Sequence, residues 1–233
     1  MYKNILLKIS GETLAGEGKF GFDFEVLNKL CKNIKKLHLK KIKISIVIGG
    51  GNFMRGSELS NGVLDRVTSD YMGMLGTVMN SMALQSNLEK LGIQTRVMTA
   101  LNINQIAEPY IKRKASRHLE KNRVVIFAAG TGNPFFSTDT AAVLRASEMK
   151  CDVILKATKV DGIYDKDPHK NKNAKKIPKI SYSDFLNKEI KVMDATAISL
   201  AKDRNLPIVI FSILDSSNIV KIVDLKGKYS IIS

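Results

Sequence analysis

Two short segments combine a basic side chain with small residues in a way that suits the binding of an anion. In Lys8-Ile9-Ser10-Gly11, a lysine ends an apolar run and is followed by backbone N–H groups that a ligand can reach. This segment alone is weak evidence, because a lysine at a strand edge is usually solvated. In Gly49-Gly50-Gly51-Asn52, three glycines let amides approach an anion without a Cβ, and Arg55 adds a planar donor. We interpret this second segment as phosphate-binding, since a tight turn rarely needs three consecutive glycines.

A third segment, residues 128–139, reads AAGTGNPFFSTD and is rich in hydroxyl and amide side chains. Such groups on a bent backbone suit the recognition of a small planar ligand through hydrogen bonds. Thr138 is also expected to cap a helix that begins at Asp139, and the two roles are compatible.

A fourth segment, residues 156–168, begins with a lysine at the end of an apolar run. An unpaired cation at such a place is costly, so we expect an anion beside Lys156, from either a ligand or a carboxylate. Tyr164 and Asp167 are placed to bracket a base and a ribose.

Several common site types are excluded. The Gly-x-x-x-x-Gly-Lys-[Ser/Thr] loop does not occur, and Gly16–Gly21 matches Gly-x-Gly-x-x-Gly but follows Ile9 too late to turn from strand into helix. We interpret it as a flexible loop. Cys31 and Cys151 have no partner at metal-binding or disulfide spacing, and the three histidines have none either. Cys31 is expected to be a buried free thiol, which fits a reducing, cytoplasmic setting.

The chain of 233 residues carries 37 Lys+Arg against 22 Asp+Glu, a net charge of +15. Only eight of the basic residues are arginines, and no aromatic residues interleave with the lysines. We therefore favour a solvated lysine-rich surface, then an electrostatic funnel for phosphate-bearing ligands, and consider nucleic-acid binding unlikely. No stretch approaches the ~20 apolar residues that span a bilayer, and no signal peptide is recognised.

Apolar runs and helical patterns alternate along the chain. The strands and helices that they predict must position the four segments described above. This alternation predicts an α/β protein: a three-layer α/β/α sandwich with a mainly parallel central sheet, whose ligands lie beyond the carboxyl ends of the strands. We expect one domain over residues 1–233. Strands are predicted at 5–9, 44–48, 95–98, 124–127, 153–156 and 208–211, and helices at 24–37 (after an Asp23 cap), 68–91, 139–148 and 195–204.

The long helix at 68–91 is expected to bury one apolar face. That face would carry Tyr71, Leu75, Val78 and Met82. The methionines around it are interpreted as core filling and not as a cofactor site: Met72, Met74, Met79 and Met82.

Taken in this order, the segments resemble those of the amino acid kinase superfamily and, within it, the bacterial uridylate (UMP) kinases. The resemblance runs essentially end to end. Its elements are residues 8–12, 47–52, 55–56, 70–74, 130–136, 156–162 and 191–194. The segment at 131–136 together with Asp70 is what looks specific to the UMP kinases.

The resemblance implies the reaction ATP + UMP → ADP + UDP, in pyrimidine nucleotide biosynthesis, by direct in-line transfer with Mg²⁺ held by phosphates rather than by protein ligands. The catalytic residues would be Lys8, Lys156, Asp139 and Arg55, with Asp194 a weaker candidate. ATP would contact Lys8, Ile9, Ser10, Gly11, Gly51, Arg55, Thr158, Tyr164 and Asp167. UMP would contact Gly50, Asp70, Thr131, Gly132, Asn133, Pro134, Phe135, Phe136, Ser137 and Thr138.

The same resemblance implies a homohexamer, activation by GTP and inhibition by UTP. The region linked to GTP would comprise Gly16, Glu17, Gly18, Lys19, Phe20 and Gly21. Two other functions stay open: a superfamily kinase acting on a carboxylate or a carbamate, and a nucleotide-sensing or nucleic-acid-binding regulator.

Overall fold

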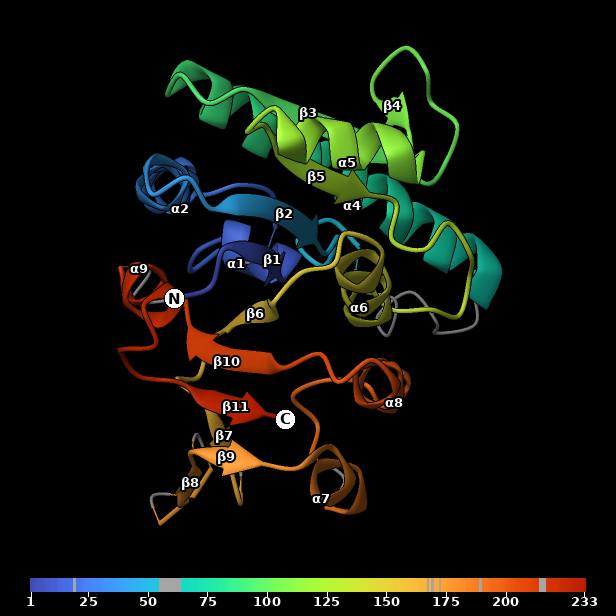
Figure 1. The fold of residues 1–233 in the computed structure, drawn as a ribbon. Coiled ribbons are helices and arrows are strands. Elements are labelled where there is room, and N and C mark those ends of the chain that lie inside the picture. Colours follow the sequence, from blue (N-terminus) through green and yellow to red (C-terminus); the bar gives the residue numbers. More distant parts are fainter. Residues whose placement is uncertain are drawn as a thin grey trace.

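A computed structural model describes residues 1–18, 20–54, 64–166, 168, 170–171, 173–188, 190–213 and 217–233. Its centre is a nine-stranded sheet in the order β4-β3-β5-β2-β1-β6-β10-β11-β9 (Figure 1). The strands are β1 (Asn4–Ile9), β2 (Lys43–Ile48), β3 (Thr95–Thr99), β4 (Glu108–Pro109), β5 (Val124–Ala128), β6 (Val153–Thr158), β9 (Lys179–Ile180), β10 (Ile208–Ser212) and β11 (Ser230–Ile232). Neighbouring strands are parallel except for β10 and β11, and β7 (Ile163–Tyr164) pairs with β8 (Lys176–Ile177) in a separate ribbon.

Helices cover both faces of this sheet, as the alternating pattern predicts. One core packs α1 (Gly11–Leu14), α2 (Phe24–Leu39), α4 (Arg66–Lys90) and α9 (Asn218–Val223) against the sheet. The other packs α5 (Lys112–Glu120), α6 (Thr138–Glu148), α7 (Tyr182–Asn187) and α8 (Ala195–Asp203). Figure 1 shows α2 and α9 on one side of the sheet and α6, α7 and α8 on the other. The three-layer α/β/α prediction is confirmed.

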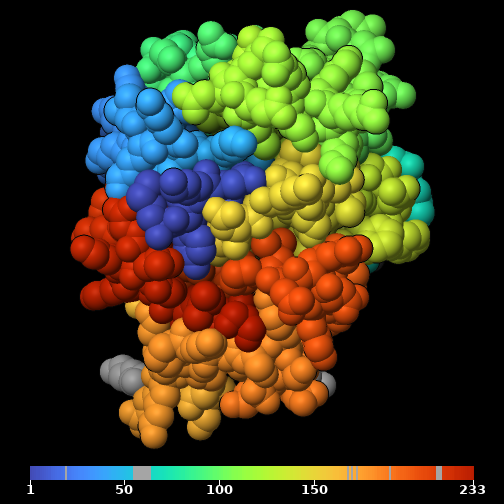
Figure 2. All heavy atoms as spheres, in the orientation of Figure 1, coloured from blue at the N-terminus to red at the C-terminus, as the bar shows by residue number. Residues whose placement is uncertain are grey.

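The central strands are mostly apolar along their whole length because helices cover them on both faces. The six predicted strands are all present, and the observed ones are longer by one or two residues. The N-terminal and C-terminal segments lie side by side (blue and red in Figure 2), where the Tyr2 N–H donates to the Val223 carbonyl at 3.0 Å. In the described part of the chain, no helix is both long enough and apolar enough to cross a membrane.

The predicted inner face of the long helix is wrong. Val78 is buried, but Tyr71, Leu75 and Met82 are 41%, 48% and 41% exposed. The sheet side of α4 is instead formed by the residues Ser69, Met74, Gly76, Thr77, Val78, Asn80, Ser81, Leu84 and Leu88. The helix has apolar residues on both sides. Of its buried polar residues, Thr77 and Asn80 bond to neighbouring loops, whereas Ser69 and Ser81 bond to backbone carbonyls one turn earlier, those of the cap residue Asp65 and of Thr77.

One further expectation about the apolar pattern is corrected, and one about a helix cap is confirmed. Met74 is buried, but Met79 is 45% exposed, so the methionines of α4 do not all fill the core. On α2, Asp23 accepts hydrogen bonds from the backbone N–H groups of Glu25 and Val26, which confirms the predicted cap. Phe24 nevertheless lies 72% exposed at the start of this helix.

Candidate active site

The centre of the site is formed by two lysines on neighbouring strands. Lys8 on β1 and Lys156 on β6 are register partners in a parallel pair, and both side chains point toward α6. Asp139, in the first turn of α6, lies between them. Its Oδ1 is 2.6 Å from the Lys8 Nζ, and its Oδ2 accepts a hydrogen bond from the Lys156 Nζ. The carboxylate expected beside Lys156 is therefore present.

This charged group is almost closed to solvent. Lys8 and Lys156 are 6% and 7% exposed, and among the described lysines only these two are buried. Burial, followed by the nearby Lys8 ammonium, lowers the pKa of Lys156 to about 8. Burial alone would raise the pKa of Asp139, but the two ammonium groups outweigh it and hold that pKa below its ordinary value. One carboxylate between two ammonium groups leaves a net positive charge, which suits an anionic ligand.

The start of α6 is fixed by a carboxylate from another helix. Ser137, and not Thr138 as predicted, caps α6: its Oγ accepts from the N–H groups of Asp139 and Thr140 at 3.0 and 3.2 Å. The Ser137 hydroxyl also bonds to Asp194, which accepts from the Thr140 Oγ1 at 3.1 Å and caps α8 through the Ala197 N–H at 2.8 Å. Asp194 therefore positions the turn that carries Asp139.

The glycine segments lie where strands β1 and β2 end at the same edge of the sheet. A Cβ on Gly11 would lie 2.6 Å from the Asn52 Oδ1, the Gly49 carbonyl and the Gly51 N. A Cβ on Gly50 would collide with the Gly73 carbonyl of α4. Gly51 differs, because its nearest neighbour would be the Glu12 Cγ at 3.4 Å, an ordinary contact. Packing thus requires glycine at positions 11 and 50, whereas Gly51 leaves its backbone open to a ligand.

A buried hydrogen-bond network joins the glycine segment to α4. The side-chain amides of Asn52 and Asn80 bond to each other at 2.7 and 3.0 Å, and Asn80 also donates to the Gly49 carbonyl at 2.7 Å. One turn earlier, the Thr77 Oγ1 accepts from the Ala129 N–H at 2.7 Å. Thr77 and Asn80 were not selected from the sequence. Their helical spacing could have indicated a shared buried face, but that side of the helix was predicted to be exposed.

A pocket of about 140 Å³ opens between the glycine segment and α4. Its lining residues are Gly50, Gly51, Met54, Ser69, Asp70, Gly73, Met74, Thr77, Gly130, Phe136 and Thr138. Three segments that sequence reasoning assigned to one ligand therefore meet here: the glycine segment, the start of α4 and residues 130–138.

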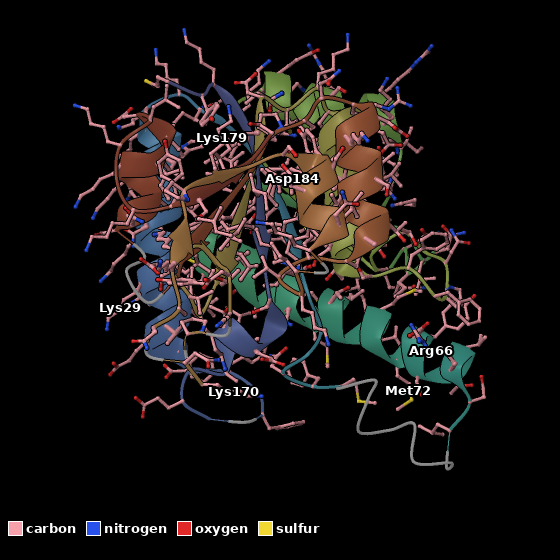
Figure 3. All side chains as sticks on the ribbon, turned by 90° about the horizontal axis from the view of Figure 1, so that it is seen from below. Lys29, Arg66, Met72, Lys170, Lys179 and Asp184 are labelled. Carbon is pink, nitrogen blue, oxygen red and sulfur yellow. The ribbon has the colours of Figure 1, made fainter. Side chains whose placement is uncertain are left out.

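Asp70 connects the start of α4 to residues 131–136. Its Oδ2 accepts from the Phe135 N–H at 2.7 Å, and both of its oxygens accept from the Arg66 Nε at 2.9 Å. The Arg66 guanidinium also lies over the Phe135 ring, 5.8 Å from its centre. Figure 3 shows Arg66 near the beginning of α4. Sequence reasoning missed Arg66, although its spacing of four residues from Asp70 places the two side chains on one helix face.

The backbone of residues 129–135 bends through left-handed conformations. Ala129, Gly130, Gly132 and Phe135 have φ values of 61°, 58°, 83° and 72°. Within this turn, the Thr131 Oγ1 accepts from the Asn133 N–H at 3.2 Å. Around Pro134, the rings of Phe135 and Phe136 are 66% and 52% exposed beside the pocket. These left-handed residues fix an open polar turn at the pocket mouth.

The residues predicted to bind ATP are only partly brought together. Ile9 ends β1, and Ser10 begins α1 with its Oγ 2.8 Å from the Thr13 Oγ1. Thr158, at the end of β6, has its Oγ1 bonded to the Val160 carbonyl at 2.6 Å. Tyr164 donates its hydroxyl to Asp161 at 2.6 Å, so that hydroxyl is already in use.

The loop assigned to GTP lies beside a second cavity. Gly16, Glu17 and Gly18 line a space of about 430 Å³ together with Glu12 and Lys159. At the far end of the loop, the Gly21 N–H donates to the Asn52 carbonyl at 3.0 Å and the Asn52 amide returns a bond to Gly21 at 2.8 Å. Phe20 is 72% exposed and contacts the Phe53 ring edge-on at 5.5 Å. This loop is thus bonded directly to the glycine segment.

Three predicted site residues, Arg55, Asp167 and Lys19, lie outside the described residues. Within the described ranges, no group of three or more His, Cys, Asp or Glu side chains is arranged to hold a metal ion.

Comparison with known proteins shows which family this chain resembles in sequence and in fold. The model of the family described as "Amino acid kinase family" matches residues 3–212. The chain is 52% identical over 231 residues to the protein named uridylate kinase of Rickettsia prowazekii (strain Madrid E), covering 99% of this chain and 96% of that protein. The uridylate kinase of Rickettsia typhi is also 52% identical, with 99% and 95% covered.

Solved structures give the same result. The UMP kinase of Bacillus anthracis superposes with a TM-score of 0.96 at 39% identity, over 100% of this chain and 96% of that one. The UMP kinase of Ureaplasma parvum gives a TM-score of 0.94 at 38% identity, over 100% and 99%.

Proposed function

This chain belongs to the amino acid kinase family, and we propose that it is a uridylate kinase, which transfers the γ-phosphoryl group of ATP to UMP. The observation that carries the proposal is the buried Lys8–Asp139–Lys156 group, which lies at the same sheet edge as the glycine segment and the Asp70 pocket. A fixed positive charge beside a pocket lined by polar groups is what transfer between two polyanions requires.

The acceptor needs no activation by a covalent nucleophile, because UMP already carries an ionised phosphate oxygen. The work of the protein is to align donor and acceptor and to neutralise charge on the transferred group. We assign this neutralisation to Lys8 and Lys156, with Asp139 holding both ammonium groups in place. Asp194 acts one step further away by fixing the first turn of α6.

Each substrate has its own end of the site. In the proposal, UMP occupies the pocket beside Gly50 and Asp70, and residues 131–138 contact its uracil and phosphate. ATP extends from the N–H groups of Gly11 and Gly51 toward Thr158 and Tyr164. Arg55 and Asp167 join these assignments from the sequence alone.

The proposal includes Mg²⁺, held by phosphate oxygens and water. The donor set fits this arrangement, because the described site residues include the cationic centre of Lys8 and Lys156, which suits phosphate groups that carry Mg²⁺ with them. When bound, Mg²⁺ would neutralise phosphate charge alongside Lys8 and Lys156.

We also propose self-association as a homohexamer, activation by GTP and inhibition by UTP. An exposed apolar stripe on α4 supports self-association: Val67, Tyr71, Leu75, Met79 and Met82 are 38–48% exposed. The bonds between Gly21 and Asn52 give an effector on the Gly16–Gly21 loop a direct route to the glycine segment. A single domain over residues 1–233 is supported by the continuous sheet, and a cytoplasmic setting by the buried free thiols of Cys31 and Cys151.

A coupled ADP-release assay tests the proposal. The purified chain is given ATP, Mg²⁺ and one acceptor at a time: UMP, CMP, acetylglutamate or carbamate. We expect turnover with UMP far above the other three. Turnover with acetylglutamate or carbamate alone would instead identify a carboxylate or carbamate kinase, and no turnover with any acceptor would favour a regulator.

A further inference from the structure

We propose that Arg66 is a positioning residue that sets the preference for a ribonucleotide acceptor, by holding Asp70 so that its Oδ1 faces the ribose. The inference rests on the proposed function. It concerns a side chain that the assignment of the acceptor pocket does not include, because Arg66 does not line the pocket itself.

The first step is the geometry of the Asp70 carboxylate. Its Oδ2 accepts from the Phe135 N–H at 2.7 Å and from the Arg66 Nε at 2.9 Å, whereas among the described residues its Oδ1 accepts from the Arg66 Nε alone. An ionised carboxylate has about four lone-pair positions, so Oδ1 retains capacity for a donor from the pocket. A ribose diol offers such donors.

The second step is that helix stability does not explain an arginine at this position. Arg66 is the first residue of α4, directly after the Asp65 cap. A cation in the first turn is unfavourable with the helix dipole, and a basic residue four positions before an acidic one is the weaker order of a helical pair. Helix stability alone therefore gives little reason for an arginine at this position, and another role would account for it.

The third step is that Arg66 contacts both sides of the pocket mouth. Besides Asp70 on its own helix, its guanidinium lies over the ring of Phe135, 5.8 Å from the ring centre. Phe135 has a φ of 72°, a conformation that a phenylalanine rarely adopts without support. Arg66 and Asp70 together hold this residue from two directions, through its ring and through its N–H.

The Asp70 side chain is only 19% exposed, so its orientation depends on these two neighbours. If the Arg66 contact is lost, the carboxylate keeps the Phe135 N–H but becomes free to rotate Oδ1 away from the pocket. The predicted consequence is loss of contact with the sugar hydroxyls, with ATP binding unaffected.

The test compares Arg66→Gln with a matched control, Arg117→Gln. Arg117 also forms an exposed helical pair, with Glu120 at 3.2 Å, but on α5, away from the pocket. Steady-state kinetics are measured with UMP and with 2′-deoxy-UMP as acceptors. For Arg66→Gln we expect the KM for UMP to rise roughly 10- to 150-fold, the effect of losing one hydrogen bond to a charged group. The KM for ATP should stay within about twofold of the wild type, since in the proposal ATP contacts neither Arg66 nor Asp70.

The decisive readout is the ratio of kcat/KM for UMP to that for 2′-deoxy-UMP. It should shrink in Arg66→Gln, remain unchanged in Arg117→Gln and be partly restored in Arg66→Lys, which keeps the charge. A merely structural role would lower activity with both acceptors equally and leave the ratio unchanged, which would overturn the inference. A wild-type chain that does not distinguish the two acceptors would overturn it as well. Failure of the wild type and Arg117→Gln to use UMP at all would instead reject the proposed function.

Discussion

Replacing Asp139 by asparagine removes the carboxylate that lies between Lys8 and Lys156 while keeping the size of the side chain. The structure gives this carboxylate two charged contacts, one to the Lys8 Nζ at 2.6 Å and one to the Lys156 Nζ, in a place almost closed to solvent. Removing one partner of a buried ion pair costs about 3–5 kcal/mol, because the remaining charge loses its compensation. If the whole of this cost appears in the activation free energy, kcat falls about 10²- to 10⁴-fold, because each 1.36 kcal/mol corresponds to a factor of ten in rate.

The expected effect on substrate binding has the opposite sign. Without Asp139 the two lysines carry one more net positive charge, so the KM values for ATP and UMP should stay level or fall. The same change removes an attraction that now raises the pKa of Lys156, so that pKa should drop below its present value of about 8. The alkaline limb of the pH profile of kcat/KM, where the ammonium loses its proton, should therefore move to lower pH.

The assay is steady-state kinetics of Asp139→Asn between pH 6 and 9, with thermal unfolding recorded on the same samples. Asp184→Asn is the matched control, because Asp184 is an exposed aspartate in the first turn of α7 (labelled in Figure 3). A folded Asp139→Asn with kcat within about fivefold of the wild type, well short of the factor that a buried ion pair implies, would refute the positioning role. So would KM values that rise more than kcat falls.

Three further predictions concern the glycines, the pH dependence and α4. Gly50→Ala should lower the free energy of unfolding in urea by about 1–3 kcal/mol, as overpacking does, because its Cβ meets the Gly73 carbonyl; Gly51→Ala should fold normally but raise the KM for ATP. If Gly51→Ala were the less stable variant, the packing argument would fail. Since burial and Lys8 lower the pKa of Lys156 to about 8, calorimetry at pH 8.5 in buffers of different ionisation enthalpy should show proton uptake when ATP binds; uptake unchanged in Lys156→Met would contradict this. Leu75→Lys should reduce the oligomer size in light scattering, whereas Leu39→Lys, at an even more exposed leucine on α2, should not; intact oligomers in both variants would show that the α4 stripe is not the self-association surface.

The sequence predicts the centre of the fold better than its periphery. The strands from Ile5 to Phe211 are visible because most of them are nearly continuous apolar runs, a consequence of burial on both faces. The short elements were missed: α5 is dominated by charged residues, and β4, β8 and β9 have two residues each, too few for a period to appear. The face of α4 was wrongly predicted because its inward side is polar, which hydrophobic spacing cannot reveal.

The candidate site divides in a similar way. Lys8, Lys156 and the glycines follow apolar runs, so local pattern is enough to select them. That Lys8 and Lys156 are neighbours depends on the pairing of β1 with β6, which no local pattern encodes. The cap of α6 was predicted at Thr138 and is Ser137. Both residues carry a hydroxyl, and only the backbone conformation decides which of them caps the helix.

The pairing of β1 with β6 also has a consequence for the order in which the molecule is made. All strands on one side of β1 in the sheet, from β4 to β2, come from residues made before β6, and all strands on the other side come from β6 onward. During synthesis β1 is therefore the open edge of an unfinished sheet, and Lys8 on that edge opposes pairing with strands of other chains. The same lysine would thus protect the edge of the nascent sheet first and, once β6 pairs with β1, form part of the buried Lys8–Asp139–Lys156 group.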